Sequence, residues 1–402
     1  MRMISLARTR TALVGIGIFA AAVSMTTGAD ASVTSSAALT WSVVPSPSRG
    51  TDSLLGGVSC VSATACTAAG DYATSGGPGR TLIESWNGTK WSVVPSPNRG
   101  GSNGGSVLYG VSCVSATACT VAGAYIHTSA SGGIDRTLIE SWNGTNWSVV
   151  PSPNRAGANG GSVLDGVSCA SATACTAVGS DTHTSTSGSI ARTLIESWNG
   201  TSWSVTPSPS PGTDSELNSV SCTTATTCTA VGVSTSASGA RVTLAESWNG
   251  ASWSVMPIPE PGADSWLEGV SCVSATACTA AGFYYTTGGG HHMTLIESWN
   301  GATWSVVPSP SPGTGSLLSG VSCVSATVCS AAGYYNPTGS TRGTLIETWN
   351  GTSWSVVPSP GRGSHSALDG VSCVSATACS ATGYYPAGGQ RKTLIESGTA
   401  NG

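Results

Sequence analysis

The sequence predicts an all-β protein, a seven-bladed β-propeller with four antiparallel strands in each blade. One unit recurs along the chain, and the first cysteines of successive units lie 50 to 56 residues apart. Each unit contains four short runs of strand-forming residues separated by turn residues. A period near 50 residues with four strands is typical of propeller blades, because the rungs of a solenoid are far shorter.

Residues 1–31 have the features of a signal peptide. Three arginines precede an uncharged apolar run at 11–25, and a small-residue cleavage site ends at Ala31. The run is too short and too rich in Gly and Ala for a good membrane span. We therefore expect a secreted, extracellular protein without membrane insertion, in which residues 32–402 form a single propeller domain.

The net charge of the chain limits the kinds of partner that it is expected to bind. The formal charge is −4 for the whole sequence and −6 after residues 1–31 are removed, and the chain contains only two lysines. Nucleic acids and anionic membranes attract basic proteins, so neither is an expected partner. Abundant Gly, Ser and Thr with few charges fits a β-rich extracellular protein, and the regular Trp, Leu, Ile and Val disfavour disorder.

The first half of each unit is predicted to be a hairpin that a disulfide closes. All fourteen cysteines fall into seven pairs with the same gap of five residues: Cys60/Cys66, Cys113/Cys119, Cys169/Cys175, Cys222/Cys228, Cys272/Cys278, Cys323/Cys329 and Cys373/Cys379. In a secreted chain such pairs indicate disulfides. Zinc is the alternative, but the two-residue spacing of zinc sites is missing and no histidine accompanies the pairs. We expect no cofactor at the cysteines and no free thiol, and each bridge should hold its own hairpin and add little to the joining of units.

The second half of each unit is a hairpin around an Asn-Gly turn. In the first unit Asn87-Gly88 separates two strand-like runs, and Asn-Gly suits a type I′ turn because both residues accept positive φ. A two-residue loop would pair Trp86 with Thr89, and a four-residue loop would pair it with Trp91. The two registers differ by two residues, so in both of them the same side chains lie on each face of the sheet. Each face carries apolar residues, which predicts a sheet packed between two neighbours.

The two ends of the chain predict a closed ring. Residues 39–45 form a fourth strand without the first three strands of a unit, and residues 393–397 form a third strand without a fourth. Together they complete a seventh blade, shared by 39–47 and 371–397. Closure removes the exposed edges that an open array would have. We expect the protein to be a monomer.

A family resemblance rests on both halves of the unit. The runs TLIESWNGTKWSVVPSP and GVSCVSATACTAAG resemble the repeats of secreted bacterial kelch-like β-propeller proteins, over essentially the whole chain after residue 31. The resemblance implies a seven-bladed propeller. The diglycine of true kelch repeats is absent and the cysteine pair is added, so the chemistry of kelch enzymes does not transfer to this chain.

A binding site is expected on one rim of the ring. Connections of a four-stranded meander alternate between rims, so the cysteine and Asn-Gly turns share the repeated rim and the variable links share the other. Variation between copies is where specificity arises. We expect a non-catalytic scaffold that binds a polysaccharide or a surface protein in the sector of the fifth to seventh units. Its candidate residues are aromatic or able to form hydrogen bonds: Trp266, Glu268, Tyr284, Tyr285, His291, His292, Tyr334, Tyr335, Asp369, Tyr384 and Tyr385.

A second candidate site is a collar around one mouth of the central channel. The position before each Gly-Val-Ser-Cys run differs from unit to unit: Gly56, Tyr109, Asp165, Asn218, Glu268, Ser319 and Asp369. Four of these side chains carry oxygen ligands suited to calcium: Asp165, Asn218, Glu268 and Asp369. The alternative is a solvated collar that holds no bound species.

Enzymatic function is the alternative to a binding scaffold. The glutamate of each Leu-Ile-Glu run is repeated seven times, which indicates a hydrogen-bond acceptor between blades, since catalysis needs two unlike carboxylates. No sialidase-type Asp-box, nucleophile elbow, zinc-protease or phosphate-loop motif is present. The remaining enzymatic possibility is a hydrolase or lyase that acts on extracellular glycans at the variable rim. An unlike acid and base in one pocket of that rim would favour it.

Overall fold

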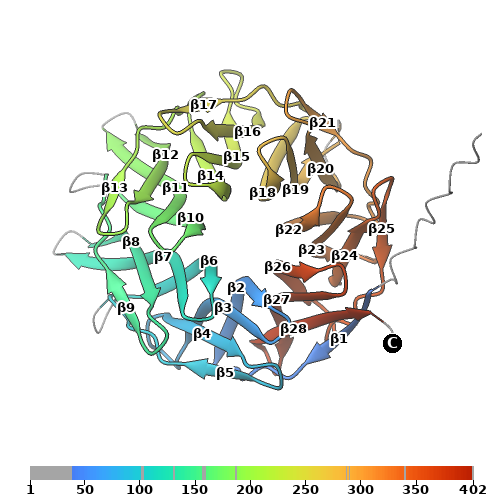
Figure 1. The fold of residues 1–402 in the computed structure, drawn as a ribbon, viewed down its shortest axis with the longest axis horizontal. Coiled ribbons are helices and arrows are strands. Elements are labelled where there is room, and N and C mark those ends of the chain that lie inside the picture. The colour runs from blue at the N-terminus through green and yellow to red at the C-terminus, as the bar shows by residue number, and fades with distance from the viewer. Residues whose placement is uncertain are drawn as a thin grey trace, which may run out of the picture. The chain divides into compact units, whose positions relative to one another are not determined.

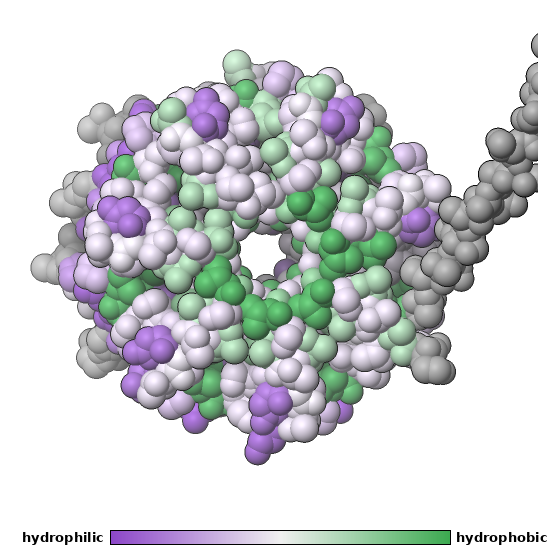
Figure 2. Space-filling model, in the orientation of Figure 1, coloured by the Kyte–Doolittle hydropathy of each residue, from purple (hydrophilic) through white to green (hydrophobic). Residues whose placement is uncertain are grey.

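Seven four-stranded antiparallel sheets form a ring (Figure 1), and the space-filling view shows an open channel at its centre (Figure 2). The computed structural model describes residues 39–100, 104–129, 132–155, 160–185, 188–286, 288, 290–338 and 341–400, all within the compact unit 36–402. Every regular element in these ranges is a β-strand, which confirms the predicted fold class. No helix in the described ranges is long and apolar enough to cross a membrane. The predicted signal peptide lies outside the described residues.

Each of the first four blades is a meander whose first strand lies innermost. Blade 1 contains β2 (Asp52–Ser62), β3 (Ala65–Ala73), β4 (Arg80–Trp86) and β5 (Trp91–Val94). Blade 2 contains β6 (Ser106–Ser115), β7 (Ala118–Ser129), β8 (Gly132–Trp142) and β9 (Trp147–Val150). Blade 3 contains β10 (Ser162–Ser171), β11 (Ala174–Ser185), β12 (Gly188–Trp198) and β13 (Trp203–Val205). Blade 4 contains β14 (Ser215–Thr224), β15 (Thr227–Thr235), β16 (Arg241–Trp248) and β17 (Trp253–Val255).

The last three blades repeat this order, and the seventh is built from both ends of the chain. Blade 5 contains β18 (Asp264–Ser274), β19 (Ala277–Tyr285), β20 (His292–Trp299) and β21 (Trp304–Val306). Blade 6 contains β22 (Ser316–Ser325), β23 (Val328–Tyr335), β24 (Gly343–Trp349) and β25 (Trp354–Val357). Blade 7 contains β26 (Ala367–Ser375), β27 (Ala378–Ala387), β28 (Gln390–Ala400) and β1 (Leu39–Val44).

The ring closes through the N-terminal strand, as the sequence predicts. Strand β1 pairs antiparallel with β28, from Leu39 opposite Ala400 to Val44 opposite Ile395. In Figure 1 the blue β1 lies beside the red β28. Ile395 packs in one apolar cluster with Leu55 and Trp91 of blade 1, so the two ends of the chain share a core. Burying one Leu or Ile side chain stabilises a fold by about 1.5–3 kcal/mol.

The Asn-Gly turns differ from the expected type I′ turn. Trp86 pairs with Trp91, so the loop has four residues and the two-residue register is wrong. Only Gly88 has positive φ, at 89°. The side chain of Asn87 accepts hydrogen bonds from the backbone N–H groups of Thr89 and Lys90, both at 3.0 Å. The asparagine therefore caps the loop with its carbonyl oxygen instead of adopting a left-handed backbone.

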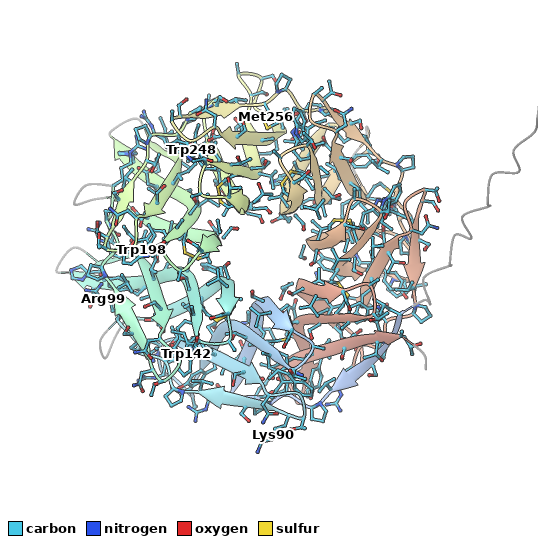
Figure 3. The ribbon with its side chains drawn as sticks, in the orientation of Figure 1. Lys90, Arg99, Trp142, Trp198, Trp248 and Met256 are labelled. Carbon is cyan, nitrogen blue, oxygen red and sulfur yellow. A yellow bond between two sulfur atoms is a disulfide. The ribbon has the colours of Figure 1, made fainter. Side chains whose placement is uncertain are left out.

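Seven local disulfides close the inner hairpins, as predicted. All fourteen cysteines are paired within their own units: Cys60–Cys66, Cys113–Cys119, Cys169–Cys175, Cys222–Cys228, Cys272–Cys278, Cys323–Cys329 and Cys373–Cys379. The sulfur bonds lie on the channel side of the blades in Figure 3, whereas Lys90 lies at the outer edge. Seven disulfides in one chain fit an oxidising, extracellular environment.

The two cysteines of a pair differ in burial, which corrects the expectation that the bridges add little to the joining of blades. The first lies on the strand that borders the open channel and is half-buried, whereas the second lies on a strand flanked on both sides and is only 3–6% exposed. The second packs in an apolar core shared with the preceding blade. Its sulfur also lies 3.7–4.0 Å from a Ser or Thr hydroxyl of that blade. The buried members are Cys66, Cys119, Cys175, Cys228, Cys278, Cys329 and Cys379.

The inner strands are joined by a ring of hydrogen bonds. In each blade the serine before the first cysteine accepts a bond from the first-cysteine N–H of the next blade, and Ser372 closes the ring by accepting from Cys60 at 3.0 Å. Neighbouring inner strands also approach closely at a β-bulge. A Cβ on Gly57 would lie 2.8 Å from the Tyr109 carbonyl oxygen, so glycine is favoured at this position of blade 1, whereas blade 4 has Ser219 there.

A buried glutamate links the outer part of six blades to the preceding blade, whereas the sequence predicts this link for all seven. In six junctions a serine hydroxyl from the preceding Pro-Ser-Pro segment donates to it: Ser46–Glu84, Ser96–Glu140, Ser152–Glu196, Ser208–Glu246, Ser309–Glu347 and Ser359–Glu396. At the seventh junction Ile258 replaces the serine, and both carboxyl oxygens of Glu297 lack a partner among the described residues. Burial raises the pKa of all seven carboxyls above the usual 4.5.

Candidate functional site

The two rims of the ring carry different kinds of connection, as the meander requires. On the repeated rim the Trp86 indole N–H donates to the Ala63 carbonyl at 3.1 Å, which joins the third strand to the cysteine turn. Gly88 lies beside Thr64 of the same turn. The links from second to third strand and from blade to blade lie at the opposite, variable rim.

Aromatic side chains of blade 5 form a continuous cluster at the variable rim. Trp266 stacks on Phe283 with ring centroids 4.9 Å apart and an angle of 10° between the rings. Tyr285 meets both rings edge-on, at 5.9 and 6.0 Å. His292 lies 6.0 Å from Phe283 and from Tyr285. The strands explain this grouping, because Phe283 and Tyr285 share a face of β19 and Trp266 lies opposite Phe283 in β18.

The cluster continues into blades 6 and 7. The rings of His292 and Tyr334 are 6.1 Å apart, and the Arg342 guanidinium lies 3.8 Å above the Tyr334 ring. Arg342 also donates to the Tyr384 hydroxyl at 3.0 Å, and Arg391 lies 5.7 Å from the Tyr384 ring. We call the full set the aromatic arc: Trp266, Phe283, Tyr285, His292, Tyr334, Arg342, Tyr384 and Arg391.

The two arginines of the arc differ in their charge partners. Arg391 is paired with Asp52 of blade 1, at 2.7 Å between Nη2 and Oδ2. Arg342 has no carboxylate within ion-pair distance among the described residues. Burial, followed by the charges of Arg342 and His291, lowers the pKa of His292, which disfavours a charged imidazole there. Arg342 is therefore a cation held in place by aromatic rings, and it acts electrostatically on the Asp369 carboxyl without forming an ion pair with it.

Three tyrosines predicted for the site serve mainly the cores between blades. Tyr284, Tyr335 and Tyr385 each pack against an apolar cluster shared with the preceding blade. Arg362 lies 5.3 Å from the Tyr385 ring and donates to its hydroxyl. The structure brings Trp266, Tyr285, His292, Tyr334 and Tyr384 together and directs these three tyrosines to the opposite face of each blade. His291 is exposed and contacts the Thr314 carbonyl oxygen through Nδ1.

The collar residues lie within the inner strands, at the β-bulges, instead of before the strands as expected. Burial raises the pKa of Asp165, Glu268 and Asp369 to about 7. The Asn218 amide donates to the Leu267 carbonyl of the next blade at 2.9 Å, so it already has a structural role. The described residues contain no group of three or more His, Cys, Asp or Glu placed to hold a metal ion. The calcium site at the collar stays a prediction.

A cavity on the variable rim escaped the sequence analysis. It has a volume of about 280 Å³ and is lined by residues of blades 1 and 2, among them Asp71, Tyr109 and Asp135, and by Val163 of blade 3. Burial raises the pKa of Asp71 to about 6, although Arg391 acts in the opposite sense. Asp71 follows the repeated glycine of the second strand, as do Phe283, Tyr334 and Tyr384. That shared position was the signal available in the sequence.

The comparisons with known proteins support the fold alone. No family model matches the chain, so none supports the kelch-like resemblance, and no curated protein matches it. The structure is similar to YCF48 bound to D1 peptide, with a TM-score of 0.53, 11% identity, and coverage of 90% of this chain and 97% of that chain. It is also similar to the GH74 xyloglucanase from Xanthomonas campestris, with a TM-score of 0.52 and 14% identity. That match covers 88% of this chain and 55% of the xyloglucanase, so this chain spans about half its length.

Proposed function

We propose that this protein is a secreted, non-catalytic binding scaffold whose ligand is an extracellular polysaccharide held on the aromatic arc. The observation that carries the proposal is the continuity of the arc. Eight side chains from blades 5, 6 and 7 connect through ring, cation–π and hydrogen-bond contacts from Trp266 to Arg391. Aromatic and arginine side chains dominate the binding energy of most interfaces.

The charge pattern of the arc favours an acidic polysaccharide. A planar guanidinium binds a carboxylate through paired N–H donors, and Arg342 has no carboxylate partner among the described residues. The aromatic rings beside it offer flat apolar faces to sugar rings. An acidic sugar would use both features at once, whereas a neutral sugar would leave the Arg342 charge unpaired.

The structural neighbours are compatible with a binding role. One of them is a propeller bound to a peptide, which supports a protein as the competing kind of ligand. Another is the xyloglucanase, which keeps a glycan among the possible ligands. Both a protein and a glycan are therefore kept as ligand classes in the experiment below.

The experiment is a binding screen of residues 32–402 against neutral and acidic polysaccharides and proteins from cell-wall fractions. We expect retention on polyuronates that weakens with added salt, because the arc contributes a cation. Arg342→Ala should reduce the affinity about tenfold, equivalent to about 1.4 kcal/mol. Lys90→Ala removes a charge from the other rim and should leave binding unchanged. Equal binding to neutral and acidic chains, or capture of proteins alone, would contradict the proposal.

A second candidate function is a hydrolase or lyase that acts on extracellular glycans. The observation that favours it is the cavity around Asp71 and Asp135, where two carboxyl groups meet a tyrosine. Asp71, with a pKa of about 6, is suited to donate a proton, and Asp135 is the second carboxyl. Two carboxyls in unlike environments are what glycoside hydrolysis requires.

Product analysis separates the two functions. Polysaccharides incubated with the protein should yield new oligosaccharides if the cavity is catalytic, and Asp71→Asn should abolish them. Loss of these products in the Asp71→Asn variant, with binding to the arc retained, would assign chemistry to blades 1 and 2. Absence of products from every polysaccharide would leave the binding scaffold as the function.

A further inference from the structure

The repeated rim contains cavities between adjacent blades, apart from the proposed site. The cavities between blades 7 and 1, 1 and 2, and 2 and 3 have volumes of about 240, 180 and 190 Å³. A fourth, between blades 5 and 6, has about 300 Å³. Figure 2 views the molecule from this rim and shows hydrophobic patches around the channel with hydrophilic ones nearer the periphery.

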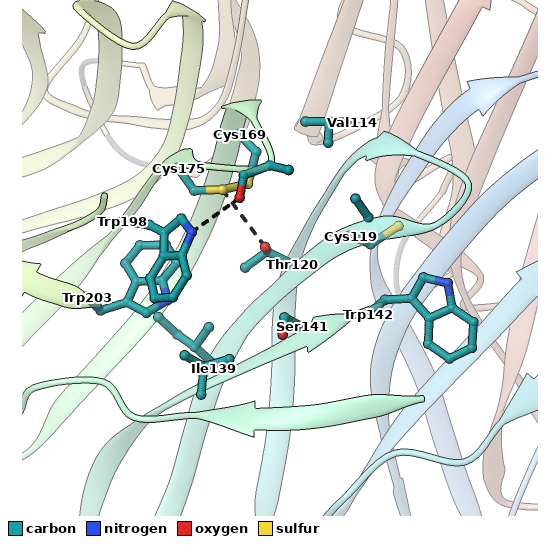
Figure 4. A pocket seen from close by; sticks show the side chains of 13 residues that line it. Val114, Cys119, Thr120, Ile139, Ser141, Trp142, Cys169, Cys175, Trp198 and Trp203 are labelled. Carbon is teal, nitrogen blue, oxygen red and sulfur yellow. Dashed lines mark hydrogen bonds between the residues drawn. A yellow bond between two sulfur atoms is a disulfide. The ribbon is translucent and has the colours of Figure 1, made fainter. Parts of the chain in front are cut away.

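Three consecutive cavities have the same walls. The following blade supplies its disulfide and its third-strand tryptophan, which is Trp86, Trp142 or Trp198. The preceding blade supplies two hydroxyls, one from its second strand and one from its third. These hydroxyl pairs are Ser380/Ser397, Thr67/Ser85 and Thr120/Ser141. Figure 4 shows the third cavity, with Trp198, the Cys169–Cys175 disulfide, Ser141 and Thr120, whose hydroxyl lies 3.9 Å from the Cys175 sulfur.

The tryptophan of each cavity is fixed before any ligand arrives. The Trp198 indole N–H donates to the Ala172 carbonyl at 3.2 Å, and its ring lies 5.7 Å from that of the buried Trp203. Trp142 donates to Ala116 in the same way, at 3.2 Å. These indoles are partly exposed, so one side remains available to the cavity. A pre-positioned ring lowers the entropic cost of binding.

The chemistry of the walls defines the ligand. No charged side chain of the described residues lines any of the four cavities, which argues against an ionic ligand. A cavity of about 150 Å³ holds benzene, so 180 to 240 Å³ suits one six-membered ring with its substituents. An aromatic wall facing hydroxyl groups matches a molecule with an apolar face and a polar edge.

We propose that these inter-blade cavities are repeated binding sites for neutral hexopyranose units. The sugar ring packs on the third-strand tryptophan, and its hydroxyls bond to the two side-chain hydroxyls that the preceding blade supplies. Equivalent sites on one rim make the protein multivalent, and linked sites raise overall affinity by about 10²–10⁴ over one site. This inference does not depend on the aromatic arc, which lies on the other rim and is expected to take an acidic chain.

The chain contains a natural contrast between junctions. Gly398 stands where the other third strands end in tryptophan, so the junction of blades 6 and 7 lacks this wall. At this junction Thr348 of blade 6 is the equivalent of Ser141 of blade 2. Each lies one residue before the last tryptophan of its third strand and pairs with a serine of the fourth strand. A leucine at Ser141 fills a cavity that has the tryptophan wall, whereas a leucine at Thr348 lies at a junction without it. Comparing the two variants therefore separates the loss of a binding cavity from a general effect of the leucine.

The test is a titration of residues 32–402 with neutral monosaccharides, followed through the indole N–H signals in NMR spectra. We expect glucose, galactose, mannose or N-acetylglucosamine to shift the signals of Trp86, Trp142 and Trp198 at millimolar concentration. The signal of Trp266, on the variable rim, should stay in place. The variant Ser85→Leu/Ser141→Leu/Ser397→Leu should lose these shifts, and Thr348→Leu should keep them. The absence of shifts with every sugar, or their persistence in the triple variant, would overturn the proposal.

Discussion

The Ser208 hydroxyl donates a 2.7 Å hydrogen bond to Glu246 of the following blade. The glutamate is fully buried, and its other carboxyl oxygen has no hydrogen-bond partner among the described residues. The bond therefore satisfies a group that water cannot reach. It joins the segment that follows the last strand of blade 3 to the third strand of blade 4.

Ser208→Ala should lower the free energy of unfolding by about 1–3 kcal/mol, because it leaves a buried acceptor unsatisfied. Chemical denaturation measures this directly. Ser254→Ala, at an exposed position of β17, is the matched control and should change stability little. A loss from Ser208→Ala no larger than that from Ser254→Ala would show that the serine–glutamate bond contributes nothing.

Stability should decrease as the pH rises from mild acid to weakly alkaline conditions. Burial raises the pKa of Glu84, Glu196 and Glu297 from 4.5 to about 8, so the native state holds protons that the unfolded chain releases. Stability is then complete below about pH 4.5 and is lost progressively toward pH 8. Urea unfolding across this range measures the slope.

Glu297→Gln removes one titrating group and should flatten this pH dependence. Because Glu297 lacks a serine donor, the substitution should also cost less at neutral pH than Glu246→Gln, which disturbs the bond from Ser208. Stability that is constant or rises across the range would contradict the raised pKa values.

Each disulfide should stabilise its own hairpin by about 2 kcal/mol, since it closes a short loop in the unfolded chain. Replacing Cys113 and Cys119 together by Ala should lower stability by at least that amount, because Cys119 also packs against blade 1, and should leave the ring closed. Non-reducing peptide mapping of the native protein should give seven local pairs. A bridge between two blades would contradict the structure.

Ring closure should depend on residues 39–45. Deleting them removes β1 and exposes the edge of β28, so the melting temperature should drop well below that of the intact protein. A variant that lacks only residues 32–36 is the control and should melt close to the intact protein. If both truncations melt alike, β1 does not close the ring.

Repetition explains why much of the fold was predictable. Seven equal cysteine spacings and two complementary ends determine the disulfides and the closure without any knowledge of packing. The pairing of Cys228 was therefore predictable, whereas its burial against blade 3 was not, because that contact joins two units. The Asn-Gly loop was less certain, because Asn87 can adopt positive φ or cap the loop with its side chain, and only the structure shows the second.

The site was less predictable because it depends on which face of a strand meets the next blade. Alternation separates Phe283 and Tyr285 from Tyr284, but the sequence does not say which side faces the core. The structure places Tyr284 against the core and Phe283 in the arc. The cavity around Asp71 and Asp135 combines residues of three blades, so no single repeat reveals it.

The most direct measurement compares the two rims in binding to an acidic polysaccharide. Trp266→Ala and Tyr285→Ala remove aromatic anchors of the arc, and each should cost about 2 kcal/mol in affinity. Thr89→Ala and Lys90→Ala, in the Asn-Gly loop of the repeated rim, should cost almost nothing. Affinity determined by titration calorimetry should therefore fall only for the first pair. Equal losses from both rims, or no loss from the arc, would contradict a binding site on the variable rim.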